Sequence, residues 1–226
     1  REDYEQTAIV CNVTPGQAHQ YTAFERFTPS GPLALLPMND NRCWCVWAVG
    51  SEEVDEMLAI SEEEFLERLQ DCFGDRLGRF SRVGKRYAYP LARNQVATQY
   101  TQRAVLIGNA AHTVHPVAAQ GFNLGLRDVA WLAEILDQAH SIQLDPGAIA
   151  VLKQYDEIRD RDISRVSGFT HGMIRLFTSQ LPPVIAGRNL GLLVTDIIPG
   201  LKQALLRRTM GLTGHQSRLA RGLGLK

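Results

Sequence analysis

One stretch in the middle of the chain limits what the rest can fold into: RAVLIGNAAHTVHPVAAQGFNLGLRD, residues 103–128. Its apolar residues 105–108 predict a short buried strand, and the helical spacing of apolar residues over 122–139 predicts an amphipathic helix. The segment between them is rich in glycine, alanine and histidine. The stretch is therefore interpreted as strand, loop and helix, and the loop carries the candidate chemistry.

Two kinds of site compete for that loop. His112 and His115 lie three residues apart, but Pro116 follows and no Cys, Asp or Glu nearby in the sequence completes a tetrahedral set, so we expect no metal. The histidines are interpreted as loop residues that bond backbone or line a cleft. The glycines match neither G-x-G-x-x-G nor a loop ending in G-K-[ST]. A tight crossover and a cofactor cradle at the helix start, near Asn123, both remain open on spacing alone.

Composition excludes several broad classes. The chain has 24 basic and 24 acidic residues, so no overall field points to nucleic acid. Contents of 45% hydrophobic and 21% charged residues are those of a globular protein. The 4 cysteines are scattered apart from Cys43 and Cys45, which argues against a disulfide framework and for a reducing, cytoplasmic setting.

The first part of the chain predicts an antiparallel sheet. Strand-like sequence occupies residues 7–13 and 23–49, and turn clusters interrupt it at residues 14–16, 29–31 and 39–41. The segment CWCVWAV has apolar residues on both faces, so one face must meet another layer or a ligand. Residues 87–92 are also extended, and Pro90 places them at an edge or a strand end.

Helices account for most of the remainder. A capping-box spacing at Ser61 and Glu64 begins a short helix that Gly74 ends. A long helix is predicted with Asp145 as its cap and Pro146 in its first turn, and it should end before residues 182–183.

The tail, residues 184–226, predicts two short helices divided at residues 199–200, with too many charges to span a bilayer. Its leucines and arginines would suit attachment at the surface of the inner membrane, although packing on its own domain or on a partner is the simpler interpretation. The fold class is therefore α+β, in three parts: a mainly antiparallel sheet region with one helix (residues 1–100), the strand-loop-helix motif (101–140) and a helical carboxy-terminal region (141–226).

The central stretch resembles the second flavin-contacting motif of the aromatic-ring hydroxylases that use FAD. That motif reads roughly R-x-x-L-x-G-D-A-A-H-x-x-x-P-x-x-G-Q-G-x-N-x-G-x-x-D, and this chain matches it at Arg103, Leu106, Gly108, Ala110, Ala111, His112, Pro116, Gln120, Gly121, Asn123, Gly125 and Asp128. Within the family the chain is most similar to the ubiquinone-biosynthesis hydroxylases. The further matches are FERFTPSGPLALLPM at 24–38, YPL at 89–91 and AGRNLGL at 186–192.

The resemblance implies a monooxygenase in which reduced FAD and O2 form a C4a-hydroperoxide, NAD(P)H is the reductant, and a polyprenyl phenol is hydroxylated. It places the phenol against the apolar sheet and assigns no catalytic acid, base or metal. The residues it implies as flavin contacts are Gly108 and Asn109 along the ribityl chain and pyrophosphate, Ala110 and Ala111 at a close backbone approach, Pro116 beside the ring, and Gln120, Gly121, Phe122 and Asn123 at the pyrimidine edge.

The chain departs from the family pattern at three points. Asn109 replaces the usual Asp, where an amide still accepts a hydrogen bond, and Ala119 replaces the usual Gly. The family's G-x-G-x-x-G unit for the ADP half of FAD and its D-G motif do not occur in these 226 residues, and the first residue is Arg1 rather than Met. We therefore expect a carboxy-terminal fragment that binds FAD poorly by itself.

Two alternatives stay open. A related flavin hydroxylase or halogenase could act on a soluble aromatic compound, although halogenases of this fold need a lysine near the ring and the first lysine of the chain is Lys85. The second alternative is a module that docks enzymes of a lipid pathway onto one another through residues 184–226.

Overall fold

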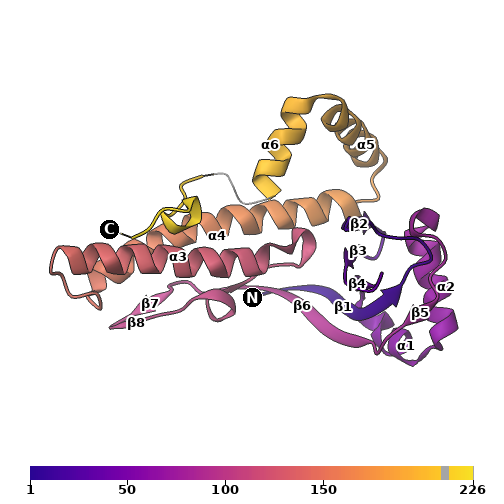
Figure 1. Cartoon of the computed structure of the whole chain (residues 1–226), viewed down its shortest axis with the longest axis horizontal. Coiled ribbons are helices and arrows are strands. Elements are labelled where there is room, and N and C mark those ends of the chain that lie inside the picture. The colour runs from indigo at the N-terminus through magenta and orange to yellow at the C-terminus, as the bar shows by residue number, and fades with distance from the viewer. Residues whose placement is uncertain (210–213, 226) are drawn as a thin grey trace. The chain divides into compact units, whose positions relative to one another are not determined.

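The computed structural model describes residues 1–209 and 214–225, apart from the side chain of residue 118 (Figure 1). The chain divides into two compact units. Residues 3–92 and 174–185 form the first, here called the sheet unit, and residues 1–2, 93–173 and 186–226 form the second, here called the helical unit.

The sheet unit is built on an antiparallel meander. Its strands are β1 (Glu2–Thr14), β2 (Phe24–Phe27), β3 (Pro32–Pro37), β4 (Cys43–Gly50), β5 (Arg82–Val83) and β6 (Tyr87–Gln95). They lie in the order β2-β3-β4-β1-β6, with β5 paired to β1. The predicted strands and the turns between them are confirmed, because turn residues follow β1 and separate β2, β3 and β4.

Both faces of β4 are apolar, as its sequence predicts. Cys45 lies opposite Cys11 of β1. Cys43, Trp47 and Val49, on the same face of β4 as Cys45, pack into the larger core with Phe65 and Leu69. The opposite face holds a smaller cluster that includes Ala48 and Leu91. All four cysteines are free, and three of them are buried in the larger core or beside it.

The helix that covers the larger core is α2 (Glu62–Phe73). The Ser61 side chain accepts a hydrogen bond from the Glu64 N–H at 3.1 Å, and Gly74 ends the helix with a φ of 82°. Both predicted ends are confirmed. The short helix α1 (Val54–Ala59) was not predicted, because it buries only Met57 and so gives no helical periodicity.

The helical unit has its core between two long helices. They are α3 (Gln120–Ser141) and α4 (Ile149–Thr178), the last residues of which belong to the sheet unit. Trp131 and Ile135 of α3 pack with Val151 and Tyr155 of α4. The tail continues with α5 (Pro182–Ile197) and α6 (Pro199–Thr209), which confirms two helices divided at Pro199.

The predicted start of the long helix is wrong by about one turn. Asp145 does not cap α4: its Oδ1 accepts the Gly147 N–H at 3.0 Å and its carbonyl accepts the Ala148 N–H at 2.9 Å. An Asp side chain that accepts the N–H two residues later forms a separate turn before the helix, so the helix begins only at Ile149.

The predicted buried strand at residues 105–108 is also wrong. Strand β8 (Ala104–Val105) pairs only with β7 (Tyr100–Thr101), in a hairpin whose turn residue Arg103 has a φ of 58°. Leu106 and Ile107 are 42% and 39% exposed. Residues 105–108 are apolar, but in the described residues no second layer covers the side chains of Leu106 and Ile107.

No single helix among the described residues is both long enough and apolar enough to cross a membrane. Helices α5 and α6 together meet those criteria, but the chain bends by 104° between them. Residues 210–213 and 226 of the predicted tail lie outside the described residues.

Candidate cofactor-binding site

The candidate site is the loop between β8 and α3, together with the first turn of α3. Two single turns of 3-10 helix, Gly108–Ala110 and Val117–Ala119, flank the short strand β9 (His112–Thr113). β9 pairs with β6 at Asn94 and Gln95. The Ala111 carbonyl also accepts the Val96 N–H at 3.0 Å, so residues 94–96, which belong to the helical unit, hold the middle of the loop in place.

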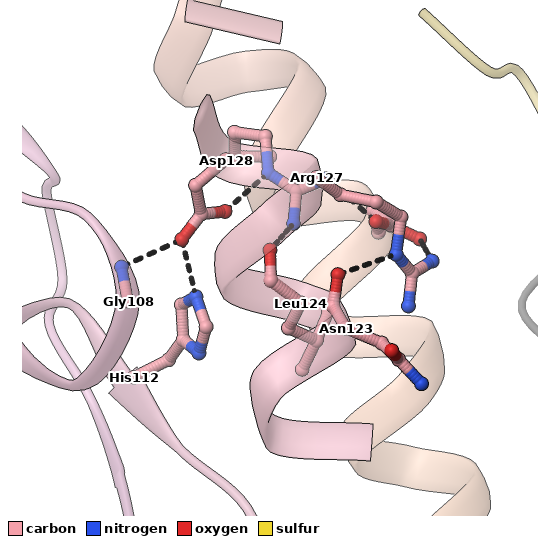
Figure 2. Close-up of polar contacts among 8 residues, drawn as sticks. Gly108, His112, Asn123, Leu124, Arg127 and Asp128 are labelled. Atoms are coloured by element: carbon pink, nitrogen blue, oxygen red, sulfur yellow. Dashed lines mark hydrogen bonds and ion pairs between the residues drawn. The ribbon is translucent and has the colours of Figure 1, made fainter. Parts of the chain in front are cut away.

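A buried carboxylate joins this loop to the helix that follows it. Asp128 of α3 is fully buried, and its Oδ2 accepts the Gly108 N–H at 2.7 Å and lies 2.8 Å from His112 Nε2 (Figure 2). Its Oδ1 accepts a hydrogen bond from Arg159 Nε of α4 at 2.6 Å. One side chain thus fixes the Gly108 turn, the His112 ring and the neighbouring helix.

The charges around Asp128 extend along α4. Arg159 is fully buried, and its Nη1 lies 2.5 Å from Asp162, which also pairs with Arg127 at 2.9 Å. Burial opposes ionisation of Asp128, but the hydrogen bond from His112, the Arg159 charge and the Gly108 N–H outweigh it and hold the pKa of Asp128 below its ordinary value. The ionised form is therefore the stable form of Asp128 at neutral pH.

His115 has a different environment from His112. It is 1% exposed, and its Nδ1 accepts the Val117 N–H at 3.1 Å. Burial lowers the pKa of His115 to about 4. The ring is therefore neutral at physiological pH and keeps its Nδ1 lone pair for the backbone, which agrees with the interpretation of His115 as a backbone-bonding residue.

The start of α3 has no side-chain cap. The residue before the helix is Ala119, which makes no side-chain cap, and the first turn contains no acidic residue. The first N–H groups of a helix have no partner within it, so this end favours an anion or an electron-rich carbonyl. Ala119 has a left-handed φ of 49°, which costs a residue with a Cβ about 1–2 kcal/mol and accounts for the family's usual glycine there.

The structure brings the predicted site residues together around this helix start. A Cβ built on Gly125 would lie 3.6 Å from the Gly108 Cα, so the turn at 108–110 touches the first part of α3. Around the contact the exposed predicted residues are Asn109, Ala110, Pro116, Phe122 and Asn123, whereas Gly108 and Gly121 are partly covered. Two predicted residues point inward: Ala111 is 2% exposed, and Gln120 is 3% exposed and donates to the Thr209 carbonyl.

Sequence reasoning missed the residues that hold the site in shape. Asp128 lies on the motif, but the resemblance assigns it no role, and Arg159 and Asp162 lie outside the motif. A signal for Arg159 exists in the sequence, because it lies four residues from both Tyr155 and Ile163 and therefore shares their buried face of α4. A charge on an apolar helical face requires a buried partner.

The loop offers few metal ligands. His112 and Asp128 are in contact, but within residues 1–209 and 214–225 no group of three His, Cys, Asp or Glu side chains is arranged to hold a metal ion. The described site therefore has donors for an organic cofactor and no metal-binding cluster.

The mixed helix and antiparallel-sheet fold matches that of FAD-dependent monooxygenases. The fold is similar to that of p-nitrophenol 4-monooxygenase PnpA from Pseudomonas putida DLL-E4, with a TM-score of 0.72 at 18% identity over 95% of this chain and 54% of that one. Residues 6–170 match a family model described as an FAD binding domain. The chain belongs to this FAD-binding family.

The curated relatives of the chain have names that specify a pathway. The chain is 42% identical to the ubiquinone hydroxylase UbiL of Rhodospirillum rubrum, over 98% of this chain and 52% of that protein. It is 28% identical to the human ubiquinone biosynthesis monooxygenase COQ6, over 90% of this chain and 51% of that protein. The chain thus spans about half the length of these relatives.

Proposed function

We propose that this chain is the substrate-binding and flavin-contacting part of an FAD-dependent monooxygenase that hydroxylates a polyprenyl phenol in ubiquinone biosynthesis, with NAD(P)H as reductant. In this proposal residues 1–100 hold the substrate, 101–140 contact the flavin and 141–226 form the helical region. The observation that carries the proposal is the uncapped start of α3, the helix whose Asp128 accepts the Gly108 N–H. The names of the relatives supply the pathway.

The site residues fit a flavin through the chemistry of their donors. The N–H groups at the uncapped start of α3 would face the pyrimidine edge, where the charge of a reduced flavin collects. Gly108 and Asn109 would follow the ribityl chain and pyrophosphate, Ala110 and Ala111 would allow the backbone to approach closely, and Pro116 would stand beside the ring. The flavin, when bound, supplies the oxygen-transfer chemistry, and the protein binds, orients and shields the reactants.

An apolar surface of the sheet unit supports a prenylated substrate. The smaller apolar cluster lies on the face of β4 that also carries Trp44. Trp44 is paired with Leu36 of the neighbouring strand β3. These two side chains are 40% and 36% exposed. Exposed apolar residues in register are suited to a greasy ligand, and we propose that the prenyl chain lies along them.

Turnover by the full-length protein tests the substrate. NADH and NADPH oxidation should be stimulated by a prenylated phenol and coupled to formation of a hydroxylated product, whereas the same phenol without its prenyl chain should stimulate several-fold less. The measurements are absorbance of the nicotinamide and product mass. Stimulation by the unprenylated phenol alone would contradict the substrate and favour a hydroxylase of soluble aromatics.

A charged substitution tests the site itself. Ala110→Glu in the full-length protein is expected to weaken FAD binding at least tenfold, roughly 1.4 kcal/mol, because it places a bulky anion where the cofactor's anionic pyrophosphate is proposed to approach. The matched control is Ala150→Glu, which alters an equally exposed alanine on α4. Fluorescence titration of FAD measures both variants. Equal affinities in the two variants would remove Ala110 from the proposed site.

The tail is proposed to contact other components. Residues 184–226 would attach the enzyme to a membrane surface or to another enzyme of the same pathway. The support is that α5 and α6 contain no buried residue among those described.

A further inference from the structure

The helical unit contains an open pocket that shares Gln120 with the proposed flavin site but is otherwise lined by residues that have no role there. It lies between the start of α3, the middle of α4 and α6, with a volume of about 690 Å³. Its apolar wall includes Val166, Phe169 and Leu205, and three arginines reach it: Arg127, Arg165 and Arg208. The pocket therefore combines an apolar wall with several guanidinium groups.

The positive charge in this pocket is not balanced. Asp162, the acidic residue that lines it, is shared by Arg127 and by the buried Arg159. Within the described part of the chain, Arg165 and Arg208 form no ion pair, and the Arg208 guanidinium lies 4.8 Å from the centre of the Phe169 ring. The buried Nη2 of Arg127 also lacks an acceptor among the described residues. These donors fit an anion with several oxygen atoms, such as a phosphate group.

Helix α6, which lines the pocket, and helix α5, which precedes it in the chain, present an apolar surface. On α5, Leu190, Leu193 and Ile197 recur at helical spacing and are 62%, 57% and 67% exposed. Ile198, at the break between α5 and α6, and Leu201 of α6 are each 46% exposed. Figure 1 shows the bend between the two helices. Residues 186–209 carry four basic side chains and one acidic side chain. An exposed apolar helix pair with excess positive charge is typical of attachment at the surface of an anionic bilayer.

We infer that this pocket binds the phosphate group of an anionic membrane lipid, while the leucines of α5 and α6 enter the bilayer surface beside it. The excess positive charge argues against a second copy of the chain as the occupant, because a symmetric contact would bring like charges together. The bend of 104° also suits helices that lie in the interface rather than cross it. The inference rests on the tail contact proposed above but not on the hydroxylation reaction.

The test is flotation of the full-length protein with vesicles, without substrate. The protein should bind vesicles of phosphatidylcholine and phosphatidylglycerol in equal parts, and bind pure phosphatidylcholine much more weakly. Each basic side chain near an anionic surface contributes roughly a fivefold factor, so Arg165→Gln with Arg208→Gln should weaken binding roughly 25-fold. Leu190→Gln with Leu193→Gln should also weaken it.

The matched control is Arg79→Gln with Arg82→Gln, which removes the same charge from exposed positions of the sheet unit and should leave vesicle binding unchanged. Equal binding to neutral and anionic vesicles would overturn the inference. An equal loss of vesicle binding in the two double arginine variants would also overturn it. A dimer that protects α5 and α6 from hydrogen exchange and does not bind vesicles would have the same consequence. Inorganic phosphate that binds at the pocket while vesicles do not would indicate a free anion instead. Since no substrate is present and no turnover is measured, each of these failures would leave the hydroxylase proposal standing.

Discussion

Asp128→Ala is expected to destabilise the helical unit by about 3–5 kcal/mol, which is the usual cost of breaking a buried ion pair from one side. The substitution leaves the fully buried Arg159 without the carboxylate that lies 2.6 Å from its Nε. It also removes the acceptor for the Gly108 N–H and the His112 ring. The result should be an open loop before α3 and, in the full-length protein, weaker FAD binding.

The measurement must resolve the two units, because a single unfolding curve does not report on each unit separately. Hydrogen exchange followed by mass spectrometry should show loss of protection at residues 106–128, with the meander of β1 to β4 unchanged. Asp128→Asn should be less severe, since an amide keeps the shape and one acceptor but loses the charge. Asp71→Asn, at an exposed position on α2, is the matched control.

A double substitution separates the charge pair from the packing. If the penalty comes from the unpaired guanidinium, Asp128→Leu with Arg159→Met should be more stable than Asp128→Ala alone, because two apolar residues replace two buried charges. Asp162 would retain Arg127 at 2.9 Å. Protection in Asp128→Ala that equals protection in Asp71→Asn would show that Asp128 does not hold the loop.

The sequence predicted the sheet unit well, because its signals are local. Alternating residues, turn clusters and the Ser61 cap each depend on neighbours within a few positions, and each has the expected place in the structure. Errors arose where a distant or alternative partner decides the outcome. Asp145 satisfies every local rule for a helix cap, yet it bonds Gly147 and pairs with Arg103 at 2.5 Å.

The candidate site divides in the same way. The motif located Gly108 and Asn123 by spacing, and the structure brings the turn and the helix start together. The ion pair between Asp128 and Arg159 joins residues 31 positions apart, and no pattern within one helix specifies that separation. The histidines were treated as equivalent loop residues, whereas His112 bonds a carboxylate and His115 bonds backbone. Tertiary contacts therefore supplied what spacing could not.

Acid should weaken the helical unit through His115. In the folded protein burial lowers the pKa of His115 to about 4, against an ordinary value of 6.5. Between these two values the unfolded chain binds more protons than the folded chain, so stability rises with pH. The contribution is complete above about pH 6.5 and is lost as the pH falls towards 4. A difference of roughly 2.5 pKa units corresponds to about 3 kcal/mol.

A variant isolates this contribution from the carboxylates. His115→Asn places an amide oxygen where it can still accept the Val117 N–H, and it does not titrate. Urea unfolding at a series of pH values, read by hydrogen exchange at residues 112–120, should therefore show a steeper loss for the native protein than for the variant between pH 6.5 and 4. His140→Asn, at an exposed position, should behave like the native protein. The pH range over which His115 changes stability lies above that of Asp128. Because the pKa of Asp128 is lowered, Asp128 changes stability only at more acidic pH. Parallel pH profiles for the native protein and His115→Asn would mean that the ring is not held neutral by burial. A steeper native profile would identify the His115 ring as the group through which acid opens the loop beside the proposed flavin site.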